Sequence, residues 1–182
     1  MKIALLGGSF NPPHFGHLMA ALYVRGALDI DQVWLMPSFH HPFGKPLAPF
    51  EHRVAMCRAM AADLGPWLVV SEVEREVGGE GRTIETLEYL VPRHPGTRFR
   101  LVIGSDILKD LPGWKSWDKI QALVEVTVLH RAGHPDPSAI GPPLAEVSST
   151  QIRQRLEAND PPTDLVPRAV LAYARKAKLY GL

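Results

Sequence analysis

Residues 7–17 (GGSFNPPHFGH) have the residue types of a phosphate-binding loop. They follow a short apolar run, and the paired glycines Gly7 and Gly8 permit the main chain to approach a ligand closely. A helix that begins near Gly16 would offer free N–H groups and the positive end of its dipole to an anion. His14 and His17 lie on one face of a helical turn, where both can donate hydrogen bonds to phosphate oxygens. The segment matches neither GxxxxGK[ST] nor GxGxxG, so it is neither a P-loop nor a dinucleotide fingerprint.

A second pattern of phosphate-binding residues lies near the other end of the chain. Residues 148–150 (SST) carry hydroxyl groups at the expected start of a helix, where main-chain N–H groups are free. Arg153 follows one turn later, and its guanidinium can donate two parallel hydrogen bonds to a phosphate. In isolation, residues 148–150 are equally consistent with an ordinary N-cap. Together with the first segment, they predict that the two ends of the chain meet around one triphosphate.

Apolar runs that alternate with amphipathic stretches must position these two segments. The apolar runs predict strands at residues 2–6, 32–36, 68–70 (extending to about 73), 99–103 and 126–129. Helical periodicity predicts helices at residues 16–28, 50–64, 84–91, 148–156 and 166–178, and a short helix that ends at 123. Thr83 is the expected N-cap of the third helix. Residues 38–49 are expected to form a loop, and the proline- and glycine-rich stretch after residue 129 a connection.

This alternation of strands and helices is typical of the α/β class. We expect a Rossmann-like, doubly wound parallel sheet of about five or six strands with helices on both faces, because βαβ crossovers are right-handed. A length of 182 residues suits a single domain that spans residues 1–182. Such sheets bind ligands at the carboxyl ends of their strands, where residues 7–17 begin.

The composition limits the classes of partner. Hydrophobic residues make up 46% of the chain and charged residues 21%, which is typical of a globular protein, and the formal net charge is +1. A charge so close to zero leaves no basic field, so neither nucleic acid nor a membrane surface is expected as a partner. No apolar run approaches the roughly 20 residues of a membrane-spanning helix. Cys57, the single cysteine, excludes an internal disulfide and favours the reducing cytoplasm, while a homo-oligomer is neither indicated nor excluded.

Several segments resemble one enzyme family. Residues 7–17 resemble the (H/T)xGH signature of the adenylyl- and cytidylyltransferase superfamily, and residues 148–153 (SSTQIR) resemble its SSTxIR motif. Residues 103–117 are similar to the IGxDxLxxLPxW segment of bacterial nicotinate mononucleotide adenylyltransferases. Residues 83–87 and 166–180 resemble the T-x-x-T-L helix start and the closing PxxVxxYIxxxxLY of the same family. Together these segments cover nearly the whole chain.

The resemblance implies an adenylyltransferase that transfers AMP from ATP to nicotinate mononucleotide, releasing deamido-NAD and pyrophosphate in NAD biosynthesis. It implies Mg²⁺ as cofactor, no metal ligands from the protein, and catalytic roles for His14, His17 and Arg153. The residues expected to bind ATP are Gly7, Gly8, Ser9, Phe10, His14, Gly16, His17, Gly104, Asp106, Ser149, Thr150 and Arg153. Those expected to bind the mononucleotide are Lys45, Arg82, Thr83, Asp106 and Trp114.

Two stretches depart from the family pattern at the expected mononucleotide site. The usual PxxxPPHK is replaced by PSFHHPFGKP at residues 37–46, where Lys45 is the best candidate for a phosphate contact and His40 and His41 have no assigned role. The usual S/P-Y-T is replaced by residues 81–83 (GRT), in which Arg82 can meet a carboxylate or a phosphate. These departures leave the acceptor less certain than ATP.

Three alternatives therefore stay open. Two of them are sibling adenylyltransferases, one that uses nicotinamide mononucleotide as the acceptor and one that uses phosphopantetheine. The third belongs to another class and is a non-catalytic nucleotide-binding sensor. Zinc binding by His14, His17, His40 and His41 is disfavoured, because no cysteine pair or HExxH accompanies them.

Overall fold

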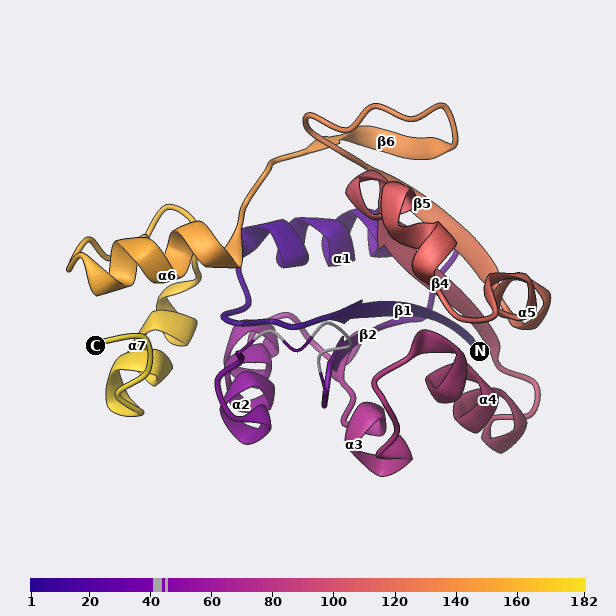
Figure 1. The fold of residues 1–182 in the computed structure, drawn as a ribbon, viewed down its shortest axis with the longest axis horizontal. Helices are drawn as coiled ribbons and strands as arrows, with labels where there is room; N and C mark the ends of the chain where they lie inside the picture. The colour runs from indigo at the N-terminus through magenta and orange to yellow at the C-terminus, as the bar shows by residue number, and fades with distance from the viewer. Residues whose placement is uncertain (41–43, 45) are drawn as a thin grey trace.

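The computed structural model describes residues 1–40, 44 and 46–182, and it has the α/β architecture that the sequence predicts (Figure 1). Its parallel sheet consists of β1 (Lys2–Gly8), β2 (Gln32–Pro37), β3 (Leu68–Val70), β4 (Arg98–Gly104), β5 (Glu125–Arg131) and β6 (Ala139–Leu144). The strand order is β3-β2-β1-β4-β5-β6. The chain therefore builds outward from β1 to one edge and returns to the other side of β1 at β4. This change of direction is the switch point at which doubly wound sheets bind ligands.

Helices cover both faces of the sheet, and Figure 1 shows α1 and α4 on opposite sides of β1. One face packs against α1 (Phe15–Ala27), α2 (Phe50–Ala61), α6 (Ser149–Glu157) and α7 (Arg168–Lys176). The other packs against α3 (Val73–Val77), α4 (Thr83–Arg93), the 3₁₀ helix η1 (Ser105–Gly113) and α5 (Trp117–Leu123). Along β1, Ala4 belongs to the first core and Ile3 and Leu5 to the second. Because both faces are buried, the central strands read as continuous apolar runs.

The structure corrects two predictions about strands. The proline- and glycine-rich stretch after residue 129 contains the edge strand β6, which the sequence pattern does not predict. Pro142 and Pro143 lie in this strand, and an edge strand tolerates proline because part of its N–H groups have no partner strand. At the opposite edge, β3 ends at Val70, and Val73 begins α3 instead of extending the strand.

Helix boundaries differ by a few residues from the periodicity, as is usual for helix ends. Thr83 is the first residue of α4, and Arg82 is its N-cap, so the prediction of Thr83 as N-cap is wrong. Helix α4 continues through Pro92 to Arg93, while α2 already ends at Ala61. Among the described residues, no helix is both long and apolar enough to span a bilayer.

Candidate active site

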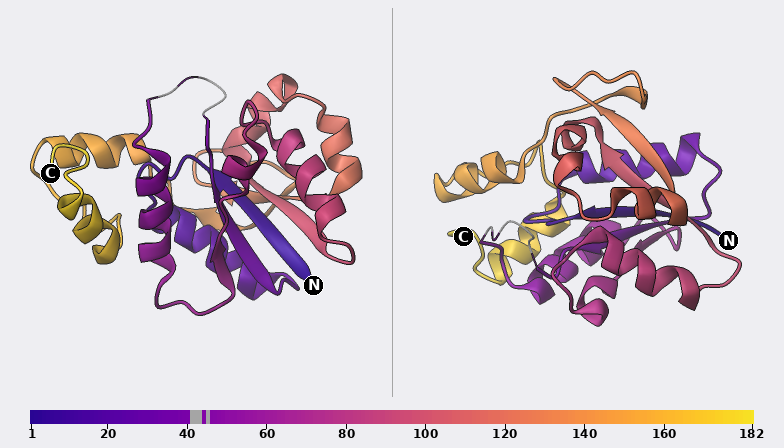
Figure 2. Two further views of the ribbon diagram at one scale, coloured as in Figure 1. Left: turned by 90° about the horizontal axis from the view of Figure 1, so that it is seen from below. Right: turned by 45° about the vertical axis from the view of Figure 1, so that its right-hand side comes forward.

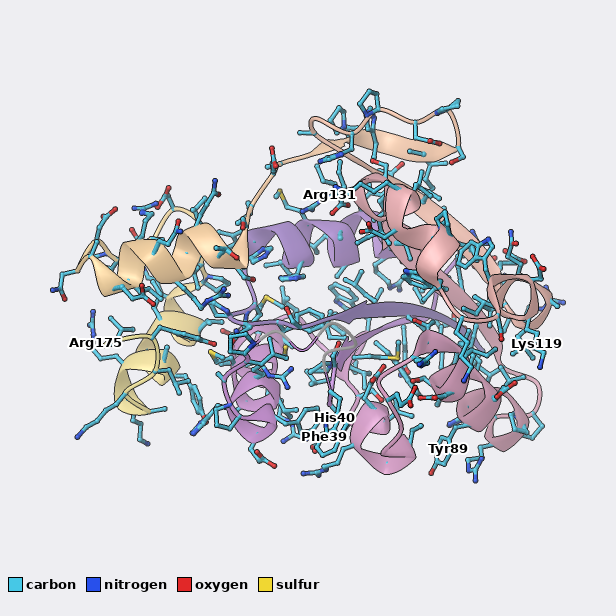
Figure 3. The ribbon with its side chains drawn as sticks, in the orientation of Figure 1. Phe39, His40, Tyr89, Lys119, Arg131 and Arg175 are labelled. Atoms are coloured by element: carbon cyan, nitrogen blue, oxygen red, sulfur yellow. The ribbon has the colours of Figure 1, made fainter. Side chains whose placement is uncertain are left out.

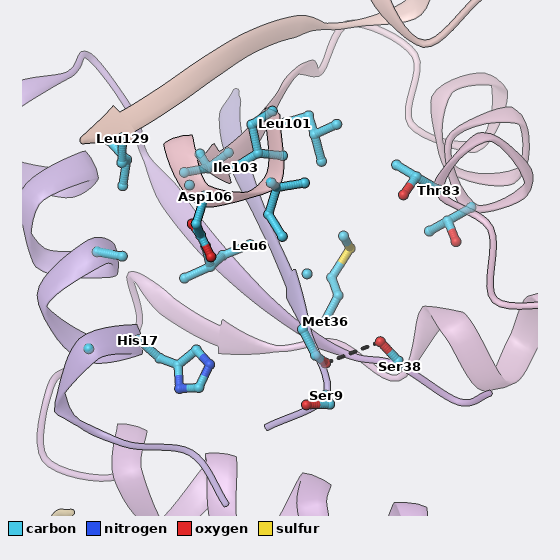
Figure 4. A pocket seen from close by; sticks show the side chains of 18 of the residues that line it. Leu6, Ser9, His17, Met36, Ser38, Thr83, Leu101, Ile103, Asp106 and Leu129 are labelled. Carbon is cyan, nitrogen blue, oxygen red and sulfur yellow. Dashed lines mark hydrogen bonds between the residues drawn. The ribbon is translucent and has the colours of Figure 1, made fainter. Parts of the chain in front are cut away.

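A cavity of about 360 Å³ lies at the carboxyl ends of β1 and β4, the position at which a doubly wound sheet binds its ligand (Figure 4). Its walls come from segments that are distant in the sequence, including the ends of β1 and β5, the start of α1 and the start of α4. The predicted site residues that line it are Gly7, Gly8, Ser9, Gly16, His17, Thr83, Gly104, Asp106 and Trp114. Folding therefore brings most of the predicted site residues to one place.

The other predicted residues of the described chain do not line this cavity. Arg82 lines a second cavity of about 520 Å³, which shares Thr83 and Trp114 with the first. In the structure, Nη2 of Arg82 pairs with Oε2 of Glu80 at 2.5 Å. The residues outside the walls of both cavities are Phe10, His14, Ser149, Thr150 and Arg153. These five belong to the loop of residues 9–14 or to α6, which contacts that loop.

His14 and His17 are stacked at the N-terminus of α1. Their ring centroids are 3.8 Å apart, and the ring of Phe10 lies 4.5 Å from that of His17. The main-chain N–H of His14 donates to Nδ1 of His17 at 3.2 Å. Because Nδ1 is an acceptor, a neutral His17 ring carries its proton on Nε2 and can donate it to a ligand. His17 lines the cavity (Figure 4), whereas His14 is buried with 4% of its surface exposed.

The environment of both histidines favours their neutral forms. Burial, followed by the positive charge of Arg131, lowers the pKa of His14 to about 3. Burial also holds the pKa of His17 well below its usual 6.5, and His14 and Arg131 add to this effect. The ligand-free protein at neutral pH therefore presents uncharged hydrogen-bond donors here. A bound polyphosphate would raise both pKa values, because nearby negative charge favours the imidazolium form.

The loop between β1 and α1 has a constrained backbone. Phe10 is fully buried and has a φ of 47°, a left-handed conformation that is costly for a residue with a bulky side chain. Its ring lies beside Gly8, where an added Cβ would come within 3.4 Å of the ring. Oγ of Ser38 donates to the carbonyl of Gly8 at 3.2 Å (Figure 4). Gly8 and Phe10 therefore shape the loop, and Gly8 also lines the cavity.

The C-terminal pattern meets this loop, as the sequence predicts. Oγ of Ser149 donates to the carbonyl of Pro12 at 3.0 Å, and Nη1 of Arg153 donates to the carbonyl of Asn11 at 2.7 Å. Nη2 of Arg153 also donates to Oγ1 of Thr150 at 3.3 Å. A guanidinium has five N–H donors, so these contacts orient Arg153 and leave donors for phosphate oxygens.

Arg131, the last residue of β5, lines the cavity although the sequence pattern does not single it out (Figure 3). Its Nε lies 3.7 Å from Oδ1 of Asp106. Gly104 makes room for this pair, because an added Cβ there would clash with the Asp106 carboxylate and come within 3.0 Å of Cγ of Arg131. The only signal in the sequence is an arginine two residues after the fifth apolar run, and its meaning depends on the pairing of β5 with β4.

Glu74 is a second cavity residue that the sequence does not indicate. It lies on α3, a helix that is itself not predicted, and its Oε1 accepts a hydrogen bond from Oγ1 of Thr86 at 3.2 Å. Burial raises the pKa of the Glu74 carboxyl, while the hydrogen bond from Thr86 and one from the main chain of Phe39 oppose that effect. A carboxyl group with a raised pKa thus belongs to the cavity wall, beside Thr86 of α4.

The loop after β2 contains the remaining predicted residues. Lys45 and His41 lie outside the described residues, so their roles stay predictions. His40 is exposed and its ring stacks edge-on against Phe39, with centroids 4.5 Å apart. The carbonyl of His40 approaches Gly81, which has a φ of 74° and where an added Cβ would lie 2.5 Å from that oxygen. Glycine at position 81 therefore allows this loop to approach the start of α4.

Comparison with known proteins identifies the family. Residues 5–155 match the model of the family described as cytidylyltransferase-like. A probable nicotinate-nucleotide adenylyltransferase of Myxococcus xanthus is 59% identical over 182 residues, covering 100% of this chain and 96% of the relative. The relative of the same name in Anaeromyxobacter sp. (strain K) is 47% identical, covering 98% of this chain and 96% of the relative.

A solved structure has the same fold. The nicotinic acid mononucleotide adenylyltransferase of Plasmodium falciparum, complexed with NaAD, superimposes with a TM-score of 0.81 at 19% identity, covering 98% of this chain and 97% of that chain. The fold, the family model and the full-length relatives agree with the resemblance seen in residues 7–17 and 148–153. The chain is therefore a member of the cytidylyltransferase-like nucleotidyltransferases and, within them, of the nicotinate-nucleotide adenylyltransferase family.

Proposed function

We propose that this protein transfers AMP from ATP to the 5′-phosphate of nicotinate mononucleotide, producing deamido-NAD and pyrophosphate in NAD biosynthesis. The observation that carries the proposal is the continuous cavity, which joins the histidine-bearing loop at one end to Thr83 and Trp114 at the other. Relatives up to 59% identical over the full chain bear the name of this enzyme. The switch point of the sheet is where such a fold places two nucleotides side by side.

The reaction needs alignment more than proton transfer. The phosphate of the mononucleotide is already ionised, so it can attack the α-phosphorus of ATP in line without a general base. The bond from the α-phosphorus to the bridging oxygen breaks, and negative charge grows on the departing pyrophosphate. Nε2–H of His17 is the group we assign to the α-phosphate, and His14 supports it from behind through the stacked ring and the N–H that it donates.

The triphosphate tail is assigned to the start of α6. Ser149, Thr150 and Arg153 would hold the β- and γ-phosphates, next to the loop that they already contact. Within the described part of the chain, no group of three or more His, Cys, Asp or Glu side chains converges as a metal site. A Mg²⁺ ion would be held by phosphate oxygens and water, as Mg²⁺ usually is in nucleotide sites, and would neutralise the tail.

The acceptor is assigned to the opposite end of the cavity. Trp114 can stack on the pyridine ring there, and Asp106, which pairs with Arg131 and is assigned to both substrates, can accept hydrogen bonds from ribose hydroxyls. Thr83 offers its side chain and a main-chain N–H at the start of α4, where the helix dipole favours an anionic group. Arg82 and Lys45 are the cations assigned to the mononucleotide phosphate.

Pyrophosphate release from ATP and Mg²⁺, measured with each of several acceptors, tests this proposal. We expect release with nicotinate mononucleotide at a kcat/KM at least about tenfold above that with nicotinamide mononucleotide, and none with phosphopantetheine. A preference for either of the other acceptors would assign the protein to a sibling activity. Tight ATP binding without release for any acceptor would overturn the enzyme assignment in favour of a nucleotide sensor.

A further inference from the structure

Asn11, in the loop of residues 9–14, accepts hydrogen bonds from three distant parts of the chain. Its side chain is 2% exposed, and its Oδ1 accepts hydrogen bonds from the N–H of Ala48 at 3.1 Å and from the hydroxyl of Tyr180 at 2.8 Å. Its main-chain carbonyl accepts the bond from Arg153. Asn11 lies three residues before His14, so a shift of Asn11 would also shift the backbone that carries His14.

Of the three bonds, the one from Tyr180 joins the residues that are farthest apart in the sequence, residue 11 and the third residue from the C-terminus. Figure 2 shows the C-terminal segment beside α2 and α6, at the end of the molecule away from the N-terminus. Tyr180 has a φ of 58°, a left-handed conformation that is rarely adopted by a tyrosine. Neighbouring Leu179 packs against the core on the face of the sheet that α7 covers. The strained backbone of Tyr180 thus places its hydroxyl within hydrogen-bond distance of Asn11.

The phenol acts here as a hydrogen-bond donor. Amide Oδ1 can only accept, so the hydroxyl must donate its proton to Asn11. Burial raises the pKa of Tyr180, which keeps the hydroxyl protonated at neutral pH although Arg153 and Arg53 lie near it. Arg53, 1% exposed, donates to the carbonyls of Ser9 and Ala48 at 2.9 and 2.8 Å. Three side chains from α2, α6 and the C-terminus therefore fix the loop, and none of them lines the cavity.

We propose that Tyr180 is a positioning residue for adenylyl transfer, acting through Asn11 to hold the loop that carries His14 and His17. The proposal rests on the proposed function, because it concerns the rate of the same reaction. Removing the Tyr180 hydroxyl takes away one of the two hydrogen bonds to Oδ1 of Asn11, while the bonds from Ala48 and Arg153 remain. The aligned transition state is sensitive to small displacements of its donors, so the effect falls on kcat more than on substrate binding.

The test compares Tyr180→Phe with Tyr173→Phe. Tyr173 lies on α7 and its hydroxyl bonds Nδ1 of His52 at 2.9 Å, so the control removes one part-buried hydroxyl contact of the same C-terminal region without touching the loop. We expect Tyr180→Phe to lower kcat about three- to tenfold, with KM for the mononucleotide within about twofold of wild type. Tyr173→Phe is expected to leave kcat unchanged, and both variants to have similar urea-unfolding midpoints.

Hydrogen exchange of the peptide that covers residues 9–17 gives a readout independent of turnover. Faster exchange there in Tyr180→Phe, but not in Tyr173→Phe, supports the contact as the cause. A kcat of Tyr180→Phe equal to that of wild type, or an equal loss in Tyr173→Phe, overturns the proposal. Absence of turnover with any acceptor in the wild-type protein contradicts the proposed function instead, and the exchange measurement then still tests whether Tyr180 holds the loop.

Discussion

Nδ1 of His17 accepts the main-chain N–H of His14 at 3.2 Å, while the two imidazole rings stack with centroids 3.8 Å apart. One histidine thus sets the tautomer of the other. The acceptor role of Nδ1 leaves Nε2–H of His17 as the donor that faces the cavity. His17 lines the cavity, whereas His14 is buried and contacts His17.

Replacing His17 by alanine is expected to lower kcat at least about a hundredfold, because loss of one transition-state donor typically costs ~2.7–4 kcal/mol. Steady-state pyrophosphate release measures the effect. His94→Ala is a suitable control, since His94 follows α4, packs edge-on against Trp34 and Phe99, and does not line the cavity. A folded His17→Ala protein with near-normal turnover would show that the assigned role is wrong.

The depressed pKa of His14 makes stability depend on pH in the acid range. An unfolded histidine takes up a proton near pH 6.5, whereas folded His14 does so near pH 3. The stability that comes from keeping this ring neutral is therefore fully present above pH 6.5 and is lost as the pH falls toward 3. Each such histidine adds a slope that approaches about 1.4 kcal/mol per pH unit to the free energy of unfolding.

Urea unfolding of wild type and His14→Asn between about pH 5 and pH 7 measures this slope. Asparagine is a good N-cap and has no proton to gain, so the variant should lose less stability on acidification. The folded pKa of His17 is lowered too, partly by His14, so the difference between the two proteins reports the His14 ring together with its effect on His17. Parallel pH profiles would contradict the burial-driven pKa shift.

Arg131 is expected to contribute to ATP binding, although the sequence pattern omits it. Arg131→Gln removes a cation from the cavity wall and leaves Asp106 unpaired, so phosphate oxygens lose attraction and gain a repelling neighbour. Calorimetric titration with ATP should show affinity lower by about 10- to 100-fold. Arg100→Gln is the matched control, because Arg100 pairs with Glu125 across β4 and β5 and does not line the cavity. Equal affinities of Arg131→Gln and wild type would exclude the contribution.

Substitutions of two neighbouring tryptophans, Trp114 and Trp117, can distinguish a role in acceptor binding from a role in packing. Trp114 lines both cavities, and Trp117 packs edge-on against it with centroids 5.7 Å apart but lines neither. Trp114→Leu is expected to raise KM for nicotinate mononucleotide about tenfold or more through lost stacking, with KM for ATP unchanged. Trp117→Leu should change stability and leave both KM values close to wild type. Equal effects of the two substitutions on KM for the mononucleotide would remove the stacking role.

Residues near one another in the sequence were the ones whose structure could be predicted. The strand–loop–helix unit of residues 2–28 follows from an apolar run, two glycines and a helical period, all of which are local. Ser148 as the N-cap of α6, accepting from the N–H of Thr150 at 3.2 Å, is local in the same way. Strand β6 was missed because its prolines argue against a strand unless the strand is known to lie at the edge.

The α/β class and the two motifs at residues 7–17 and 148–153 can be read from the sequence alone, because they depend on residue types at fixed local spacing. The folded structure is needed to see that Arg131 and Glu74 line the cavity, that His14 is buried against His17, and that Tyr180 donates to Asn11. These relationships join residues through strand order and helix packing, and a pairing between distant segments leaves no local periodicity to detect. The residue types of the candidate site can therefore be read from single segments, whereas its geometry depends on how the sheet orders them.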